Sequence, residues 1–254
     1  MLGKTTVCEY NADLFHCDFS KHLFLGHLGT HLLNVADKHS GDRGYGVIYL
    51  QTIDATWVLS RLAIEMERMP EANEHFTVET WVESVMKYFT SRDFEIKSKD
   101  GTVLGYSRSM WAMINTRTRE PMDIFSVRDG IIRDYVEKEK PCPIARPSRV
   151  TMSDSAEKVG EEIAKYCDID VNGHINSIEY IRHVLDLFSM SWYAAHRLQR
   201  FDIAYVAEGH CGDTLQFFRE EVSPLEYNVE IKKVSDDCTE PVVLCRSKVK
   251  FVNI

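Results

Sequence analysis

Hydrophobic positions in the first half of the chain follow a helical spacing and then a strand spacing. The helical spacing predicts a helix that Ser20 caps and that Gly41 and Gly44 end, and residues 5–19 before it look like an extended lead-in. Its apolar positions are Leu25, Leu28, Leu32, Val35 and Ala36. Segments rich in β-branched and aromatic residues then predict strands at 46–50, 56–66, 76–85, 89–98 and 103–115. The first half therefore looks like a helix followed by an antiparallel meander.

The second half repeats this order. A helical pattern over 177–196 precedes strand patterns at 201–208, 214–222, 226–234 and 242–253. Three local matches lie 139, 135 and 138 positions apart: Arg61-Leu-Ala-Ile64 with Arg200-Phe-Asp-Ile203, Glu95-Ile-Lys97 with Glu230-Ile-Lys232, and 108–115 with 246–253. Matches in one order at nearly one offset indicate an internal duplication. Between the halves, proline and mixed charge predict a linker with one short helix near 130–139.

One polar stretch, 167–177, stands directly before the second helix. In an extended backbone Asp170, Asn172 and His174 would point to the same side, which gathers a carboxylate, an amide and an imidazole. Asn176 is the expected N-cap, and Glu179 is placed to complete a capping box. The start of a helix favours negative charge, including a developing oxyanion. The stretch is therefore a candidate catalytic site.

The same letters allow two other interpretations. Asp168-x-Asp170-x-Asn172-Gly173, followed five residues later by Glu179, matches the calcium loop of an EF-hand. An EF-hand needs a helix on each side of its loop. The repeat predicts a strand or loop before this stretch, so the first of the two helices would be missing. A turn that only caps a core helix is the third interpretation.

Composition narrows the classes of function. The 254 residues carry a formal net charge of -9 and no long basic run, which argues against nucleic acid as a partner. The seven cysteines (8, 17, 142, 167, 211, 238 and 245) form no CxxC pair, so we expect reduced thiols rather than disulfides or a zinc site. No apolar run is long enough to span a bilayer, and the N-terminus lacks a signal core. We expect a cytoplasmic protein.

With these segments in place, the chain resembles the acyl-ACP thioesterases of plant plastids and bacteria. Four segments carry the resemblance: Thr56–Met66, Val78–Val82, Arg92-Asp93-Phe94 and Asp168–Asn176, the last with the family's Asp-x-Asn-x-His motif. The resemblance implies an α+β fold, a tandem (double) hotdog in which each half wraps an antiparallel sheet around a long central helix. It implies an N-terminal hotdog at 1–120 that binds the acyl chain, a linker at 121–155 and a catalytic C-terminal hotdog at 156–254.

The resemblance also assigns roles. Asp170, Asn172 and His174 carry over as catalytic positions, and Glu208 is the match for the family's catalytic Glu. Plant members have a cysteine directly after that Glu, but Gly209 stands here and Cys211 comes two residues later, so a cysteine nucleophile is in doubt. The first half lacks the Asp-x-Asn-x-His order in 13–18, which predicts one catalytic set per chain. No plant transit peptide is present, which suggests a bacterial form.

The implied reaction is hydrolysis of the thioester of a fatty acyl group on acyl carrier protein, which releases the free fatty acid, with no cofactor and no metal. Glu208 or His174 would serve as the base that activates water. Two alternatives stay open: an acyl-CoA thioesterase of the hotdog class, and a non-catalytic acyl-binding hotdog protein. A homodimer is also open. Candidate docking residues for the acidic carrier are Arg117, Arg119, Arg146, Arg149, Arg197 and Arg200, although most look like ordinary surface charges.

Overall fold

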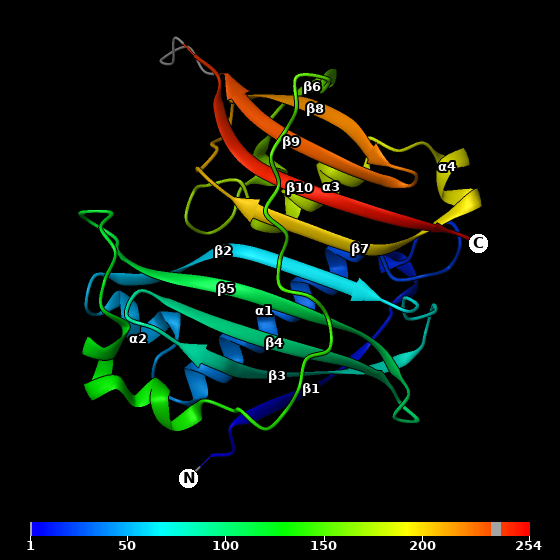
Figure 1. Cartoon of the computed structure of the whole chain (residues 1–254). Helices are drawn as coiled ribbons and strands as arrows, with labels where there is room; N and C mark the ends of the chain where they lie inside the picture. Colours follow the sequence, from blue (N-terminus) through cyan, green and yellow to red (C-terminus); the bar gives the residue numbers. More distant parts are fainter. Residues whose placement is uncertain (1, 235–239) are drawn as a thin grey trace. The chain divides into compact units, whose positions relative to one another are not determined.

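The computed structural model describes residues 2–234 and 240–254, and these form two compact units, Met1–Arg146 and Pro147–Ile254. Each unit is an antiparallel sheet with helices (Figure 1). Unit 1 contains β1 (Thr5–Asn11), η1 (Leu14–His16), α1 (Leu25–Asp42), α2 (Val47–Gln51), β2 (Ala55–Met66), β3 (His75–Val85), β4 (Phe89–Ser98), β5 (Val103–Asn115) and η2 (Ile124–Tyr135). Unit 2 contains β6 (Glu157–Ile163), η3 (Tyr166–Asp168), α3 (Ser177–Leu185), α4 (Met190–Ala195), β7 (His196–Tyr205), β8 (Thr214–Ser223), β9 (Glu226–Val234) and β10 (Val242–Asn253).

The two sheets have the same topology. The strand order is β1-β3-β4-β5-β2 in unit 1 and β6-β8-β9-β10-β7 in unit 2, with antiparallel pairing throughout. Each first strand pairs with the third, which is what a duplicated unit requires. The sequence pattern had not predicted either first strand, because β1 and β6 are edge strands with mostly exposed or half-buried residues and no clear alternation.

Helix α1 lies against the sheet of unit 1 and packs on β1 and β3 (Figure 1). The five apolar residues that predicted this helix are all buried. The helix begins later than expected, because Phe24 rather than Ser20 is its N-cap residue and Ser20 belongs to a turn. The helical periodicity therefore located the buried face correctly, whereas Ser20 marked the preceding turn and not the helix start.

Two other predicted elements differ from the structure. Residues 46–50 are predicted as a strand, but Val47–Gln51 form the short helix α2 with Gly46 as its N-cap residue. A Cβ atom at Gly46 would lie 2.5 Å from the Gly41 Cα atom, so glycine permits the close approach of the two backbones there. The single helix predicted over 177–196 is two helices, because the Ser189 hydroxyl accepts a hydrogen bond from the Trp192 N–H (3.1 Å) and caps a new helix. A short apolar run does not distinguish strand from helix.

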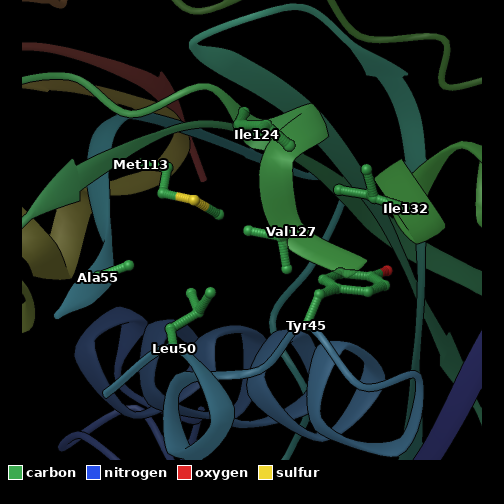
Figure 2. Close-up of a cluster of buried hydrophobic side chains, with 7 residues drawn as sticks. All are labelled: Tyr45, Leu50, Ala55, Met113, Ile124, Val127 and Ile132. Carbon is green, nitrogen blue, oxygen red and sulfur yellow. The ribbon is translucent and has the colours of Figure 1, made fainter. Parts of the chain in front are cut away.

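Residues 121–146, expected to belong to a linker, pack on unit 1. The segment η2, kinked at Arg128–Gly130, covers the end of the sheet with Ile124, Val127 and Ile132 (Figure 2). Further along, the Lys140 ammonium group pairs with the carboxylates of Glu79 (2.6 Å) and Glu95 (2.8 Å). Apolar packing therefore holds the η2 part of this stretch on unit 1, and ion pairs hold the part around Lys140.

No helix among the described residues is long and apolar enough to cross a membrane. Six of the seven cysteines are described, and all six are free thiols. The seventh, Cys238, lies outside the described residues.

Candidate active site

The polar stretch of unit 2 forms a tight turn, not the extended segment that the alternation argument assumed. The Asp170 N–H donates to the carbonyl of His174 (2.8 Å), and the Gly173 N–H donates to the carbonyl of Asp170 (3.0 Å). Gly173 has φ of 81°, a conformation that favours glycine. The three candidate side chains are thus brought together by the turn rather than by strand alternation.

Asp170 stabilises this turn with its carboxylate. Its Oδ1 accepts hydrogen bonds from the N–H groups of Asn172 (2.8 Å) and His174 (3.3 Å), and its Oδ2 accepts from the Asn172 side-chain amide (3.3 Å). Its hydrogen bonds therefore fix the positions of Asn172 and His174 through their backbone. This is a positioning role, which differs from a contact with the imidazole ring.

The His174 imidazole lies beside the Glu208 carboxylate. The His174 Nε2 atom lies 3.4 Å from the Glu208 Oε2 atom, and both side chains are partly exposed, at 28% and 37%. An imidazole beside a carboxylate, open to water, is suited to general acid–base chemistry. The structure therefore places all four sequence-predicted residues in one connected cluster.

Backbone hydrogen bonds hold the segment of Glu208 against the turn. The Ile175 N–H donates to the carbonyl of Gly209 (2.8 Å), which joins the residue after His174 to the residue after Glu208. The Val206 N–H donates to Leu244 on β10 (2.8 Å). Glu208 was expected at the end of a strand over 201–208, but β7 ends at Tyr205 and Glu208 lies beyond it. Its position is set by neighbouring backbone on both sides.

The start of α3 is capped as predicted by Asn176, whose Oδ1 accepts from the Ile178 N–H (2.9 Å). The expected capping box does not form, because the Glu179 carboxylate pairs with Arg182 (2.8 Å) instead. Of the two expected capping side chains, only Asn176 therefore caps the N-terminus of α3.

Gly209 leaves no room for the cysteine found in plant members. A Cβ atom at this position would lie 2.6 Å from Ile175 Cδ1 and 2.9 Å from Tyr180 Oη. Tyr180 is buried, and burial raises the pKa of its hydroxyl. Cys211, two residues on, is exposed. A cysteine at position 209 would therefore require Ile175 and Tyr180 to shift.

The calcium interpretation does not fit this geometry. A strand and the single 3-10 turn η3 precede the loop, where an EF-hand has a helix. The Asp168 carboxylate accepts from the Lys165 N–H (2.6 Å), which uses it within the turn. Among residues 2–234 and 240–254, no three His, Cys, Asp or Glu side chains are arranged to hold a metal ion. His210, beside Cys211, packs its ring edge-on against His174 at 5.1 Å.

Unit 1 contains a turn of the same construction that the sequence search missed. The Asp18 N–H donates to the carbonyl of His22 (2.8 Å), and Asp18 Oδ1 accepts from the N–H groups of Ser20 (2.8 Å) and His22 (3.1 Å). Lys21, at the position of Gly173, also has positive φ. The Ser20 hydroxyl donates to Asp18 (2.7 Å) and lies 2.9 Å from His22 Nδ1. The shared signal is Asp-x-polar-x-His, hidden because serine replaces asparagine.

The turn of unit 1 has no equivalent of Glu208. The Leu23 N–H donates to the carbonyl of Pro70 (2.9 Å), just as Ile175 bonds to Gly209. The residue before Pro70 is Met69, so methionine occupies the position of the acid. This replacement is consistent with the prediction of one catalytic set per chain. That prediction compared residues 13–18 with the motif, whereas the equivalent turn is Asp18–His22.

A cavity of about 120 Å³ lies inside unit 1. Most of its wall is apolar, and polar groups come from Asp37, Ser40, Tyr45, Thr90 and Arg92. The apolar lining residues are Leu33, Ala36, Val47, Trp57, Trp111 and Ile132. Two of these residues, Trp57 and Trp111, are tryptophans of the sheet, on β2 and β5.

Several arginines considered for carrier docking are neutralised within their own units. Arg117 pairs with Asp54 (2.9 Å), Arg146 with Glu83 (3.4 Å) and Arg200 with Asp202 (2.8 Å). The exposed or half-buried pairs of Arg117 and Arg146 contribute little stability, whereas the Arg200–Asp202 pair is mostly buried. All three pairs reduce the local positive charge. Docking by these residues remains a prediction.

Two family models match most of the chain. The acyl-ACP thioesterase N-terminal domain matches residues 3–135, and the acyl-ACP thioesterase C-terminal domain matches residues 153–245. A curated relative, the chloroplastic dodecanoyl-[acyl-carrier-protein] hydrolase of Cinnamomum camphora, is 29% identical over 198 residues, which is 74% of this chain and 52% of that protein. The chain spans about half the length of the curated relatives it matches.

Solved structures give the same grouping. An acyl-ACP thioesterase from Bacteroides thetaiotaomicron superposes with a TM-score of 0.91 at 48% identity, covering 98% of both chains. The 12:0-ACP thioesterase from Umbellularia californica has a TM-score of 0.86 at 18% identity, covering 100% of this chain and 99% of that one, which shows a shared fold. The double-hotdog fold predicted from the sequence is confirmed.

Proposed function

The chain belongs to the acyl-ACP thioesterase family, and we propose that it hydrolyses the thioester that joins a fatty acyl group to acyl carrier protein. The observation that carries this proposal is the His174–Glu208 pair, 3.4 Å apart beside the turn that Asp170 stabilises. The names of the relatives support the substrate class. The product is a free fatty acid, and its release ends chain elongation.

In the proposed reaction a water oxygen attacks the thioester carbonyl carbon. The His174–Glu208 pair takes a proton from this water, and the bond between carbonyl carbon and sulfur breaks. The departing thiolate of the phosphopantetheine arm takes a proton from the same pair. A base with a pKa near neutral is effective in this step, which suits an imidazole oriented by a carboxylate. No metal or cofactor is required by this scheme.

Asn172 is proposed to hold the carbonyl oxygen as negative charge develops on it. A side-chain amide has two N–H donors, and one of them is directed to Asp170. The second would bond the oxygen of the tetrahedral intermediate, where such a donor is most effective. Asp170 acts through the other two residues by fixing the turn.

The acyl chain is proposed to bind in unit 1, the predicted acyl-binding half. The cavity there has apolar walls that include two tryptophans, which suits a short part of an aliphatic chain. Unit 2 would then carry out the chemistry. A cytoplasmic location, docking of the carrier on surface arginines and a homodimer remain predictions.

The test is hydrolysis by the purified chain across a panel of acyl-ACPs, measured as release of the carrier thiol. We expect turnover for at least one chain length and a loss in His174→Ala. Acyl-CoAs of the same lengths serve as comparison. Faster turnover of acyl-CoA would favour the acyl-CoA thioesterase alternative, and tight binding without hydrolysis would favour an acyl-binding protein.

A further inference from the structure

The cavity of unit 1 has an unusual polar wall. Arg92, on β4, is 5% exposed and lines the cavity together with Tyr45 and Thr90. Its guanidinium donates to the Thr80 hydroxyl (3.2 Å) and lies 3.3 Å from His39 Nδ1. The Tyr45 hydroxyl is a further hydrogen-bond partner. A guanidinium has five N–H donors, so these three contacts use only part of its capacity.

A second buried guanidinium lies close by. Arg43 is 4% exposed, and it donates to the carbonyls of Gly3 (2.6 Å), Thr5 (2.8 Å) and His39 (2.9 Å) and to the Thr6 hydroxyl (2.9 Å). Every hydrogen-bond partner of Arg43 and Arg92 within the described residues is neutral. His39 is neutral too, because burial and the nearby Arg92 lower its pKa to about 2. Two buried positive charges therefore share this region, and none of these hydrogen-bond partners is a carboxylate.

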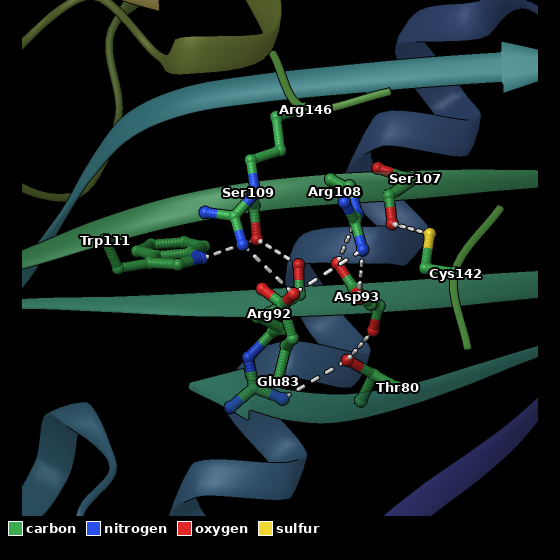
Figure 3. A network of polar contacts seen from close by, with 10 residues as sticks. All are labelled: Thr80, Glu83, Arg92, Asp93, Ser107, Arg108, Ser109, Trp111, Cys142 and Arg146. Carbon is green, nitrogen blue, oxygen red and sulfur yellow. Dashed lines mark hydrogen bonds and ion pairs between the residues drawn. The ribbon is translucent and has the colours of Figure 1, made fainter. Parts of the chain in front are cut away.

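The nearest acid in the sequence does not compensate them. Asp93 follows Arg92 on β4 and so faces the opposite side of the sheet, where it pairs with Arg108 at 3.1 Å (Figure 3). Asp37 is the one acidic residue among the cavity-lining residues, and it is exposed. Burying a charge without a partner of opposite sign is unfavourable. An anionic group in the cavity would supply that partner.

The size of the cavity limits what fits. About 120 Å³ is close to the roughly 150 Å³ of an engineered cavity that binds benzene, so about six non-hydrogen atoms fit. The apolar wall suits a short aliphatic segment, and Arg92 suits a planar group with two acceptor oxygens.

We propose that this cavity is a carboxylate-binding site: it holds a short aliphatic carboxylate, or the carboxylate end of a longer chain, with the carboxylate on Arg92. The free acid and the far end of an acyl chain are two sources of the same chemistry. Binding of the free acid does not depend on the proposed hydrolase function, whereas binding of a carboxylate-ended acyl group rests on it.

The first experiment measures binding of butyrate and of its neutral isostere butyramide to the full chain by calorimetry. We expect butyrate to bind at least tenfold more tightly. In Arg92→Met the affinity for butyrate should fall at least tenfold, while that for butyramide stays within about twofold, because hydrogen bonds to charged groups are the stronger ones. Arg117→Met, at an exposed ion pair, is the matched control and should bind as the parent does.

A second variant covers the case in which Arg92→Met does not fold. Ala36→Phe fills the cavity and leaves Arg92 in place, and it should abolish butyrate binding. Equal affinity for butyrate and butyramide in the parent chain, or undiminished butyrate binding in both variants, would refute the site.

The last experiment identifies the source of the carboxylate. Turnover is compared for two acyl-ACPs of equal chain length, one ending in a methyl group and one in a carboxylate. A preference of tenfold or more for the carboxylate, lost in Arg92→Met, assigns the site to the acyl chain. Equal turnover with retained butyrate binding assigns it to the free acid. If no acyl-ACP is hydrolysed, the proposed function fails while the binding experiment still decides the site.

Discussion

The two units of this chain share a turn but differ in what surrounds it. Asp18 and Asp170 accept the same pair of backbone hydrogen bonds, and His22 and His174 end both turns. Only the turn of unit 2 faces a carboxylate, Glu208, whereas unit 1 has methionine at the matching position. Under the proposed function, the backbone of the turn is thus not what distinguishes the catalytic unit.

The cavity shows the opposite difference. Ala36 lines the cavity of unit 1. Phe188 is the equivalent residue of unit 2, because both come equally far after the N-cap residue of their helix, α1 or α3. Phe188 packs its ring against Phe251 (4.8 Å) and Tyr227 (5.1 Å). A small residue leaves space where a large aromatic one fills it. We infer that duplication divided the work, with binding space in one unit and acid–base chemistry in the other.

The largest expected effect is on turnover when the pair in unit 2 is broken. His174→Ala and Glu208→Met should each lower kcat about 10²- to 10⁴-fold, the usual contribution of a positioned general acid or base. Glu208→Met gives unit 2 the residue that unit 1 already has. The measurement is single-substrate kinetics on one acyl-ACP, with thermal unfolding to check the fold.

Unit 1 offers matched controls for these variants. His22→Ala and Met69→Ala alter the equivalent positions and should leave kcat within about twofold. If His22→Ala lowered kcat as much as His174→Ala does, the division of work between the units would be wrong.

The second prediction separates stability from activity at the two aspartates. Asp18→Ala and Asp170→Ala each remove an acceptor of two backbone N–H groups, which should cost about 1–3 kcal/mol of unfolding free energy in both units. Only Asp170→Ala should also lower kcat, by about 10- to 100-fold, since small misplacement of reacting groups is costly. Urea unfolding and kinetics on the same samples test this. Equal kcat values for the two variants would contradict it.

The third prediction concerns the plant-like cysteine. Gly209→Cys should destabilise the chain by about 1–3 kcal/mol, because its Cβ would meet Ile175 and the Tyr180 hydroxyl. It should not raise turnover. Adding Tyr180→Phe removes the hydroxyl and should recover part of the stability, which thermal unfolding of the single and double variants measures. A fully stable Gly209→Cys would show that this position tolerates a nucleophile.

The sequence allowed much of this arrangement to be predicted. Strands β4, β5 and β10 have the predicted bounds, because alternation and a clear Asp-Gly turn define them locally. Edge strands β1 and β6 were missed because one exposed side gives them little pattern. Likewise, the four site residues came from a motif, but their geometry did not, because only tertiary hydrogen bonds turn 170–174 back on itself.

The cavity was beyond prediction for a different reason. Its existence depends on side chains from two helices, three strands and η2 failing to fill a common space, and no local pattern encodes that. Arg92 was quoted only as part of a family-like segment, and its burial without a carboxylate follows from Asp93 facing the other side. The cavity and the unpaired charge of Arg92 both depend on side-chain packing and strand register between segments far apart in the sequence.

The smallest expected effect compares how the two helices begin. Asn176 caps α3 with its side chain, whereas Phe24 at the start of α1 makes no such bond. Asn176→Ala should therefore cost about 1 kcal/mol of unfolding free energy, and Phe24→Asn should gain a few tenths to about 1 kcal/mol, because Phe24 is half exposed and loses little packing. Urea unfolding of both variants measures these changes. If Phe24→Asn destabilised the chain, the exposed phenylalanine would contribute more by its contacts than a cap does, and the two helix starts would be held by different forces.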